Sequence, residues 1–113
     1  MFGVKQGKDV MEGRTVAWEV LMTSKAIKQK NDLPEDVSAQ LWRLILDIER
    51  IGPIQKGWSH FSALKKDKRI PEGSYHCHIK SGRPTYVVCW RVENKKIKIV
   101  EIFYVGTHEN TPY

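Results

Sequence analysis

The chain has 113 residues, the length of one domain with a single core, and its 41% hydrophobic and 28% charged residues are typical of a soluble globular protein. No apolar run approaches the roughly 18 residues that span a bilayer, and the first residues are too polar for a secretory signal, so we expect a cytoplasmic protein without membrane contact. The formal net charge of +6 is compatible with a surface that binds polyanions and with a lysine-rich surface that only keeps the protein soluble.

The first part of the chain predicts an arm and a strand. Residues 1–13 contain glycines and mixed charges without periodicity, and we expect them to form a flexible arm. A single domain then covers residues 14–113. Apolar and polar side chains alternate from Arg14 to Met22, which indicates a strand at the start of this domain.

Two helices are predicted next. Thr23 or Ser24 can cap a short basic helix that runs towards Asp32. Pro34 and the two acidic residues after it favour the start of a second helix, which the pair Gly52-Pro53 ends. The second helix has an apolar stripe at helical spacing, which we interpret as its core face: Val37, Leu41, Leu44, Ile45, Ile48 and Ile51.

Residues 54–71 show no period and predict a connection without regular structure. Trp58 and Phe61 can anchor this connection to the body of the domain. His60 lies between these two aromatic residues, and we interpret it as structural.

Three strands close the chain, over residues 74–80, 85–93 and 96–105, and the turns between them are short enough for antiparallel hairpins. The whole order is β-α-α-β-β-β. It predicts an α+β fold in which two helices pack on one face of a small, mainly antiparallel sheet, while the other face is open.

Alternation along the strand 74–80 divides its side chains between the two faces of the sheet. The apolar row is Tyr75, Cys77 and Ile79, and the row on the open face is His76, His78 and Lys80. Cys77 and Cys89 have no metal-binding or redox spacing, so we interpret both as small buried core residues.

The positive charge is concentrated around these histidines. The segment from Lys56 to Lys98 has eleven basic and three acidic residues, a net charge of +8, whereas the first 55 residues are balanced. A concentrated basic field attracts polyanions, and nucleic acid is therefore the partner class that the charge distribution favours.

The polar tail after Gly106 can bring His108, and with it Tyr113, to the end of the sheet that carries the histidine pair. Such a site could cleave RNA without a metal ion. A base removes the proton of a ribose 2′-OH, an acid protonates the leaving 5′-oxygen, and cations stabilise the phosphate charge. We therefore expect no cofactor.

Two other interpretations of His76 and His78 stay open at this point. The pair could lie on a solvated sheet face without a function. It could also share a metal ion with His108 as the third ligand, since histidines at i and i+2 of a strand point the same way.

The order and spacing of three motifs resemble the RelE/ParE superfamily of toxins from toxin–antitoxin pairs, over about residues 14–113. The motifs are Leu33-Pro34-Glu35-Asp36-Val37 before the long helix, Gly73-Ser74-Tyr75-His76-Cys77-His78-Ile79-Lys80 leading into Tyr86-Val87-Val88-Cys89-Trp90-Arg91-Val92, and Val105-Gly106-Thr107-His108-Glu109 with Tyr113.

The resemblance implies which residues act. RelE-type members have basic catalytic residues on the second strand, a further one after the glycine of the last strand, and often a tyrosine beyond it. The matching positions here are His76, His78, His108 and Tyr113, with histidines where lysines or arginines are common. The resemblance and the charge together imply contacts to RNA phosphates from Lys65, Lys66, Arg69, Lys80, Arg83 and Arg91, of which Arg83 or Arg91 would replace an arginine usual at the third strand.

The resemblance also implies a function. RelE-type members are endoribonucleases that cut messenger RNA in the ribosomal A site, and an antitoxin holds them inactive in a hetero-oligomer. ParE-type members share the fold but inhibit DNA gyrase, so a toxin or binding protein without nuclease activity is the alternative.

Overall fold

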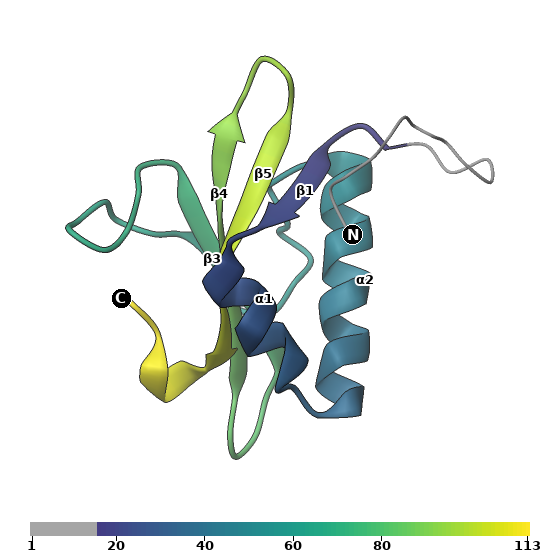
Figure 1. Ribbon diagram of the computed structural model, residues 1–113, viewed down its shortest axis with the longest axis vertical. Coiled ribbons are helices and arrows are strands. Elements are labelled where there is room, and N and C mark those ends of the chain that lie inside the picture. Colours follow the sequence, from purple (N-terminus) through teal and green to yellow (C-terminus); the bar gives the residue numbers. More distant parts are fainter. Residues whose placement is uncertain (1–15) are drawn as a thin grey trace.

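The computed structural model describes residues 16–113, in which two helices pack against a five-stranded sheet (Figure 1). The predicted order is confirmed, and one two-residue strand, β2, is added in the segment that showed no period. The arm predicted over residues 1–13 lies outside the described residues. The elements are β1 (Glu19–Met22), α1 (Ser24–Asn31), α2 (Glu35–Ile51), β2 (Ser62–Ala63), β3 (Ser74–Lys80), β4 (Tyr86–Asn94) and β5 (Ile99–Thr107).

The strand order in the sheet is β1-β5-β4-β3-β2. β1 pairs parallel with β5, and every other pair is antiparallel, which confirms the mainly antiparallel sheet. The parallel pair is possible because two helices separate β1 from the rest of the sheet and carry the chain across one face, whereas the hairpins of the meander need only short turns. No helix within residues 16–113 combines the length and the apolar character needed to cross a bilayer.

Two strands, β1 and β5, begin three or more residues later than predicted, and β4 begins one residue later. The N–H groups of Ala17 and Trp18 both donate to the Glu49 carbonyl, at 2.9 and 3.0 Å, so the chain is tied to the end of α2 before it enters the sheet. β5 begins three residues late because the turn before it is longer: Asn94 Oδ1 accepts from the N–H of Ile97 at 3.0 Å, and Lys98 has a φ of 57°.

Both helices form for local reasons that the sequence indicated. Thr23 caps α1, its Oγ1 accepting from the N–H of Ala26 at 3.0 Å. α2 starts after Pro34 and buries Val37, Leu41, Leu44, Ile45 and Ile48. Ile51, the last member of the predicted stripe, is 59% exposed, because the chain turns inward at Gly52 and the buried residues Gly52, Pro53 and Gln55 take that place instead.

Replacing Gly52 by alanine is expected to lower the free energy of unfolding by about 1–3 kcal/mol. Gly52 has a φ of 99°, which disfavours any side chain, and an added Cβ would lie 2.8 Å from Trp18 Nε1. A urea denaturation curve measures the loss. Gly57→Ala is the matched control, since no atom lies within 4 Å of its added Cβ and its φ is not positive. Equal midpoints for the two variants would contradict this account of Gly52.

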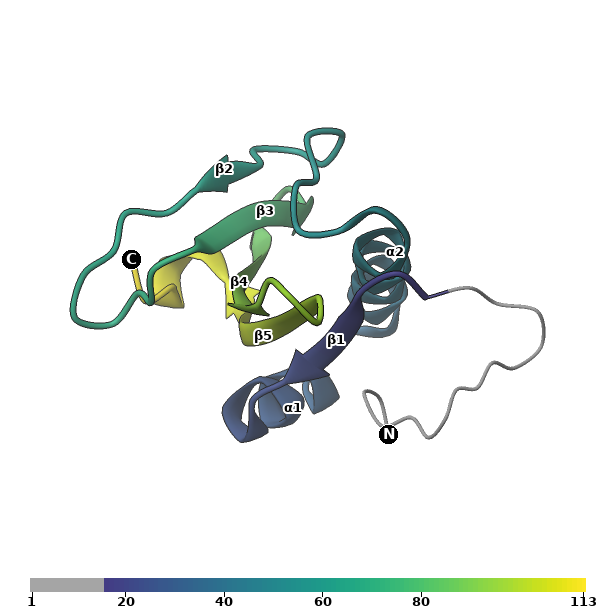
Figure 2. The same cartoon turned by 90° about the horizontal axis from the view of Figure 1, so that it is seen from above.

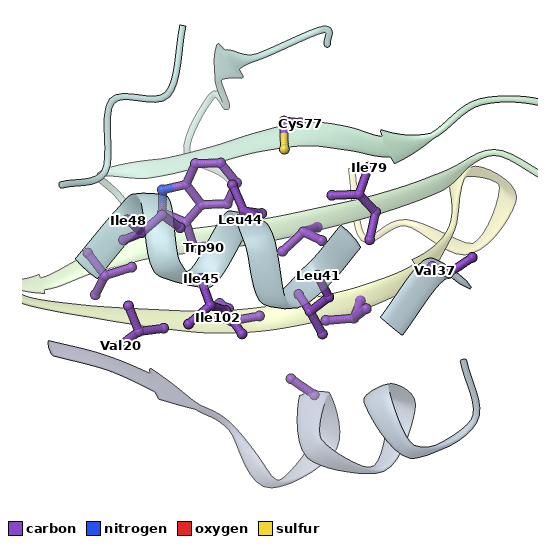
Figure 3. Close-up of a cluster of buried hydrophobic side chains, with 14 residues drawn as sticks. Val20, Val37, Leu41, Leu44, Ile45, Ile48, Cys77, Ile79, Trp90 and Ile102 are labelled. Atoms are coloured by element: carbon purple, nitrogen blue, oxygen red, sulfur yellow. The ribbon is translucent and has the colours of Figure 1, made fainter. Parts of the chain in front are cut away.

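The main core lies between α2 and one face of the sheet (Figure 3). Trp90 of β4 is its largest member, and its indole N–H donates to the Pro53 carbonyl at 3.1 Å. Ala26 brings α1 into the same core, so both helices pack on one face as predicted. The core consists of Val20, Ala26, Val37, Leu41, Leu44, Ile45, Ile48, Cys77, Ile79, Val88, Trp90, Val100, Ile102 and Val105.

The opposite face of the sheet carries a second, smaller apolar cluster of Val87, Cys89 and Tyr104. Cys77 and Cys89 are both buried and free, as predicted, and they belong to the clusters on opposite faces of the sheet. Burial raises the pKa of the Cys89 thiol to about 12, so it remains a neutral apolar group. The face predicted to be open is therefore apolar at its centre, and the chain after β5 folds over it.

Candidate functional site

All four histidines of the chain gather beside this second cluster. The ring centroids of His60 and His78 are 4.1 Å apart, those of His76 and His78 are 5.9 Å apart, and those of His78 and His108 are 5.5 Å apart. The Tyr113 ring lies 4.9 Å from that of His76. We call these four histidines and Tyr113 the histidine site.

β3 positions the first two histidines. Alternation along this strand turns Cys77 and Ile79 into the main core and leaves His76 and His78 on the other face, as predicted. Their cross-strand partners on β4 are Cys89 and Val87. Because both partners belong to the smaller apolar cluster, the two imidazoles lie next to apolar side chains, which exclude water from one side of each ring.

The segment after β5 brings in His108 and Tyr113, as the sequence predicted. The N–H of His108 donates to the Thr85 carbonyl at 2.8 Å, and residues 108–110 form a short 3₁₀ helix. This helix redirects the chain over the sheet, so the C-terminal segment and α2 lie on opposite sides of it (Figure 2). Tyr113 thereby returns to His76 from a strand two positions away in the sheet.

His60 is the member of the site that sequence reasoning missed. The sequence interpretation made it structural; its side chain is exposed and stacks on His78, while Trp58 and Phe61 on either side pack against the core. Its φ of 57° lies in the left-handed region and reverses the chain there. A histidine between two aromatic anchors was the only signal in the sequence.

Lys80 does not lie with the histidines. The pairing of β3 with β4 shifts between His78 and Lys80, and this bulge ends the alternation on which the prediction depended. The Lys80 ammonium instead binds Asp36 at the start of α2, with Nζ 2.7 Å from Oδ2. This ion pair lowers the pKa of Asp36 through the hydrogen bond and the nearby positive charge.

Of the two arginines predicted to replace the usual one, only Arg83 is near the site. It lines an open pocket of about 490 Å³ together with His78, His108 and Glu109 and the turn residues Gly82, Pro84 and Thr85. Arg91 lies at the other end of β4, where its guanidinium binds the carboxylates of Glu93 and Glu101, the latter at 3.0 Å. Those two carboxylates offset its charge.

The remaining predicted cations lie on the exposed loop between β2 and β3. Arg69 lines a second pocket of about 780 Å³, formed with α1, β5 and the tail after it. Lys65 and Lys66 line neither of these two pockets and are exposed. The structure thus brings together the four residues predicted to be catalytic and Arg83, but not the lysines.

The environment of the site favours neutral rings. Burial lowers the pKa of both His76 and His78 below the ordinary value near 6.5. The charges of His60, His76 and His108 lower the pKa of His78 further. Burial raises the pKa of Tyr113 to about 12. At neutral pH, His78 can therefore accept a proton, and Tyr113 keeps its own.

The alternative of a metal site finds no support in the geometry. Within residues 16–113, no group of three or more His, Cys, Asp or Glu side chains is arranged to hold a metal ion. The histidines meet through ring faces and edges, as in the stacked pair of His60 and His78. A set of adjacent proton donors and acceptors beside an arginine-lined pocket suits acid–base chemistry on an anionic substrate.

No protein-family model and no curated protein sequence matches the chain. Three solved structures are similar to it in fold. The archaeal RelE in its complex with RelB from Pyrococcus horikoshii has a TM-score of 0.65 at 15% identity, over 84% of this chain and 99% of that one. The RelBE2 toxin–antitoxin complex of Mycobacterium tuberculosis gives 0.57 at 19%, over 82% and 100%. The isolated RelE toxin of E. coli gives 0.58 at 19%, over 85% and 89%. The chain therefore has the RelE-like fold, as the resemblance in its motifs implied.

Proposed function

We propose that the protein is a RelE-like toxin of a toxin–antitoxin pair and that its histidine site cleaves messenger RNA on the ribosome without a metal ion. One observation carries the proposal: three imidazoles, His60, His76 and His108, surround His78 at centroid distances of 4.1–5.9 Å, beside a pocket that Arg83 lines. Imidazoles can accept and donate protons near neutral pH, and a guanidinium can bind a phosphate.

In the proposed reaction, His78 accepts the proton of a ribose 2′-OH while the 2′-oxygen attacks the adjacent phosphorus. The bond between phosphorus and the 5′-oxygen breaks, and protonated His108 gives a proton to that oxygen. The products are a 2′,3′-cyclic phosphate and a 5′-hydroxyl. The lowered pKa of His78 suits the base, and His108 lines the same pocket, 5.5 Å away, where it can reach the other side of one phosphate.

Three further groups support this reaction. Tyr113 remains a neutral phenol and can donate a hydrogen bond to a phosphate oxygen. Ser62 of β2 places its hydroxyl 3.3 Å from Nδ1 of His76, which fixes the orientation of that ring. Arg83 can offset the negative charge that increases on the phosphate during attack.

The partners follow from the same comparison. The similar structures from Pyrococcus horikoshii and Mycobacterium tuberculosis are complexes of a toxin with an antitoxin. We expect this protein, too, to be held in a hetero-oligomer by a cognate antitoxin in the cytoplasm. The segment of net charge +8 between Lys56 and Lys98 favours contacts with negatively charged groups. In the active toxin these would be RNA phosphates, and in the inhibited complex they would be acidic side chains of the antitoxin.

Expression of the intact protein is expected to arrest growth and translation, while the double variant His76→Ala, His108→Ala is tolerated. The double variant loses the proposed acid and one supporting imidazole, and each positioned acid–base group typically contributes about 10²–10⁴-fold. Growth after induction measures the effect, and mapping of RNA 5′ ends locates new cuts within codons.

The matched control is Lys28→Ala with Arg43→Ala, two exposed residues of α1 and α2 outside the basic segment, which should leave the toxin active. Equal toxicity of the histidine double variant and the intact protein would remove the catalytic role of these residues. Induced DNA damage without new RNA ends would instead support the alternative, a toxin that inhibits gyrase.

A further inference from the structure

Contacts with neighbouring residues hold the ring of His60 in one position. Its ring lies 4.1 Å from that of His78, with only 16° between the two ring planes, which is a face-to-face stack. Ser59 and His60 are also joined by a contact of 2.9 Å between Oγ and Nδ1. The His60 side chain thus meets β3 from outside the sheet, on the face that carries the other histidines.

Anchors on both sides hold this short segment in place. The indole N–H of Trp58 donates to Asp47 Oδ2 at 2.9 Å, which ties the segment to α2. The ring of Phe61 stacks on Tyr75 and Trp90 at centroid distances of 5.6 and 6.0 Å, so it is packed against the core.

The backbone connects the same segment directly to β3. The N–H of His78 donates to the Ser59 carbonyl at 2.8 Å, next to the stacked rings. A histidine that is exposed, held by aromatic anchors and bonded to the strand of its stacking partner is placed by the fold, and its position does not depend on chance contact of surface side chains.

We propose that His60 is a positioning residue of the site: its ring stacks on His78, fixes the plane of that imidazole and allows only one of the two stacked rings to be an imidazolium cation. Two imidazolium rings stacked at this distance would repel each other, since little solvent can enter between them. A proton on His60 therefore leaves His78 neutral and ready to act as a base.

Several groups besides His60 surround His78 and influence its protonation. His76 lies beside it on β3, His108 approaches from the 3₁₀ helix, and Arg83 and Glu109 line the same pocket. Val87, its partner on β4, is apolar. Among the nearby charges, that of His60 is the largest influence that lowers the pKa of His78, after burial.

The test separates the effect of ring stacking on His78 from the effect of the His60 charge. His60→Phe keeps a flat ring on His78 but cannot be protonated, and His60→Ala removes both. Titration of the His78 ring protons by NMR in the full chain is expected to move to higher pH in both variants. RNA cleavage near the optimum pH should fall roughly tenfold in His60→Ala, through loss of orientation, and recover in His60→Phe. At pH 5.5, His60→Phe should be slower than the intact protein.

An unchanged titration of His78 in His60→Phe would overturn the inference, and so would equal rates of the two variants near the optimum when the intact protein cleaves RNA. Arg43→Ala, at an exposed position of α2 outside the basic segment, serves as the control and should leave the His78 titration and the cleavage rate unchanged. The role in cleavage rests on the proposed function, but the coupling of the two rings does not. If the titration shifts and no RNA is cut by any form, the ring coupling stands and the nuclease proposal fails.

Discussion

Replacement of His78 by glutamine is expected to lower the rate of RNA cleavage by about 10²–10⁴-fold, the usual contribution of a positioned general base. His78 is the centre of the histidine site, since its ring contacts those of His60, His76 and His108. Glutamine has nearly the same reach and can still form hydrogen bonds, but it cannot accept a proton at neutral pH. The loss should therefore appear in kcat rather than in RNA binding.

Cleavage rates on ribosome-bound messenger RNA and separate measurements of RNA binding would show whether the loss lies in kcat alone. Arg83→Ala offers the comparison within the same pocket: it removes a phosphate contact, so it should weaken binding as well as slow the reaction. Arg43→Gln, at an exposed position of α2 outside the basic segment, should match the intact protein. If His78→Gln cleaves RNA as fast as the intact protein, His78 is not the base.

Replacement of Trp90 by alanine is expected to lower the free energy of unfolding by about 3–5 kcal/mol, a large share of the total stability of a small domain. Trp90 has no exposed surface, and its indole N–H binds the Pro53 carbonyl. The substitution leaves a cavity and an unpaired carbonyl in the core. It also removes one of the two rings on which Phe61 stacks, and Phe61 helps to hold His60.

Urea denaturation followed by circular dichroism measures this loss. Trp90→Phe provides the control, because it keeps most of the ring and loses mainly the hydrogen bond, so its loss should be about 1–3 kcal/mol. Midpoints of Trp90→Ala and the intact protein that agree within error would mean that Trp90 does not support the core in this way.

Periodic features were predictable because they depend only on neighbouring residues. The apolar stripe of α2 and the alternation of Cys77 with His76 and His78 both follow from the geometry of one helix or one strand. The same holds for Thr23, whose side chain caps α1 from three residues away. These features gave the correct order of elements and two of the histidines.

Breaks in a period could not be predicted. The bulge between His78 and Lys80 arises from pairing with β4, and it moves the Lys80 ammonium from the histidine face to Asp36. The charge of Arg91 is likewise offset by Glu101 of β5, a pair that exists only in one strand register. Each of these two cations pairs with a carboxylate on another helix or strand, Lys80 with Asp36 of α2 and Arg91 with Glu101 of β5.

The sequence by itself determined the RelE-like order of elements, the basic segment and the pair His76 and His78, since local spacing and composition contain that information. Only the tertiary structure decided that His60 joins this pair and that Lys80 does not. His60 reaches it through a turn anchored on the core, whereas a bulge directs Lys80 to Asp36 of α2. Such contacts depend on packing between segments that are distant in the chain, and no local pattern specifies them.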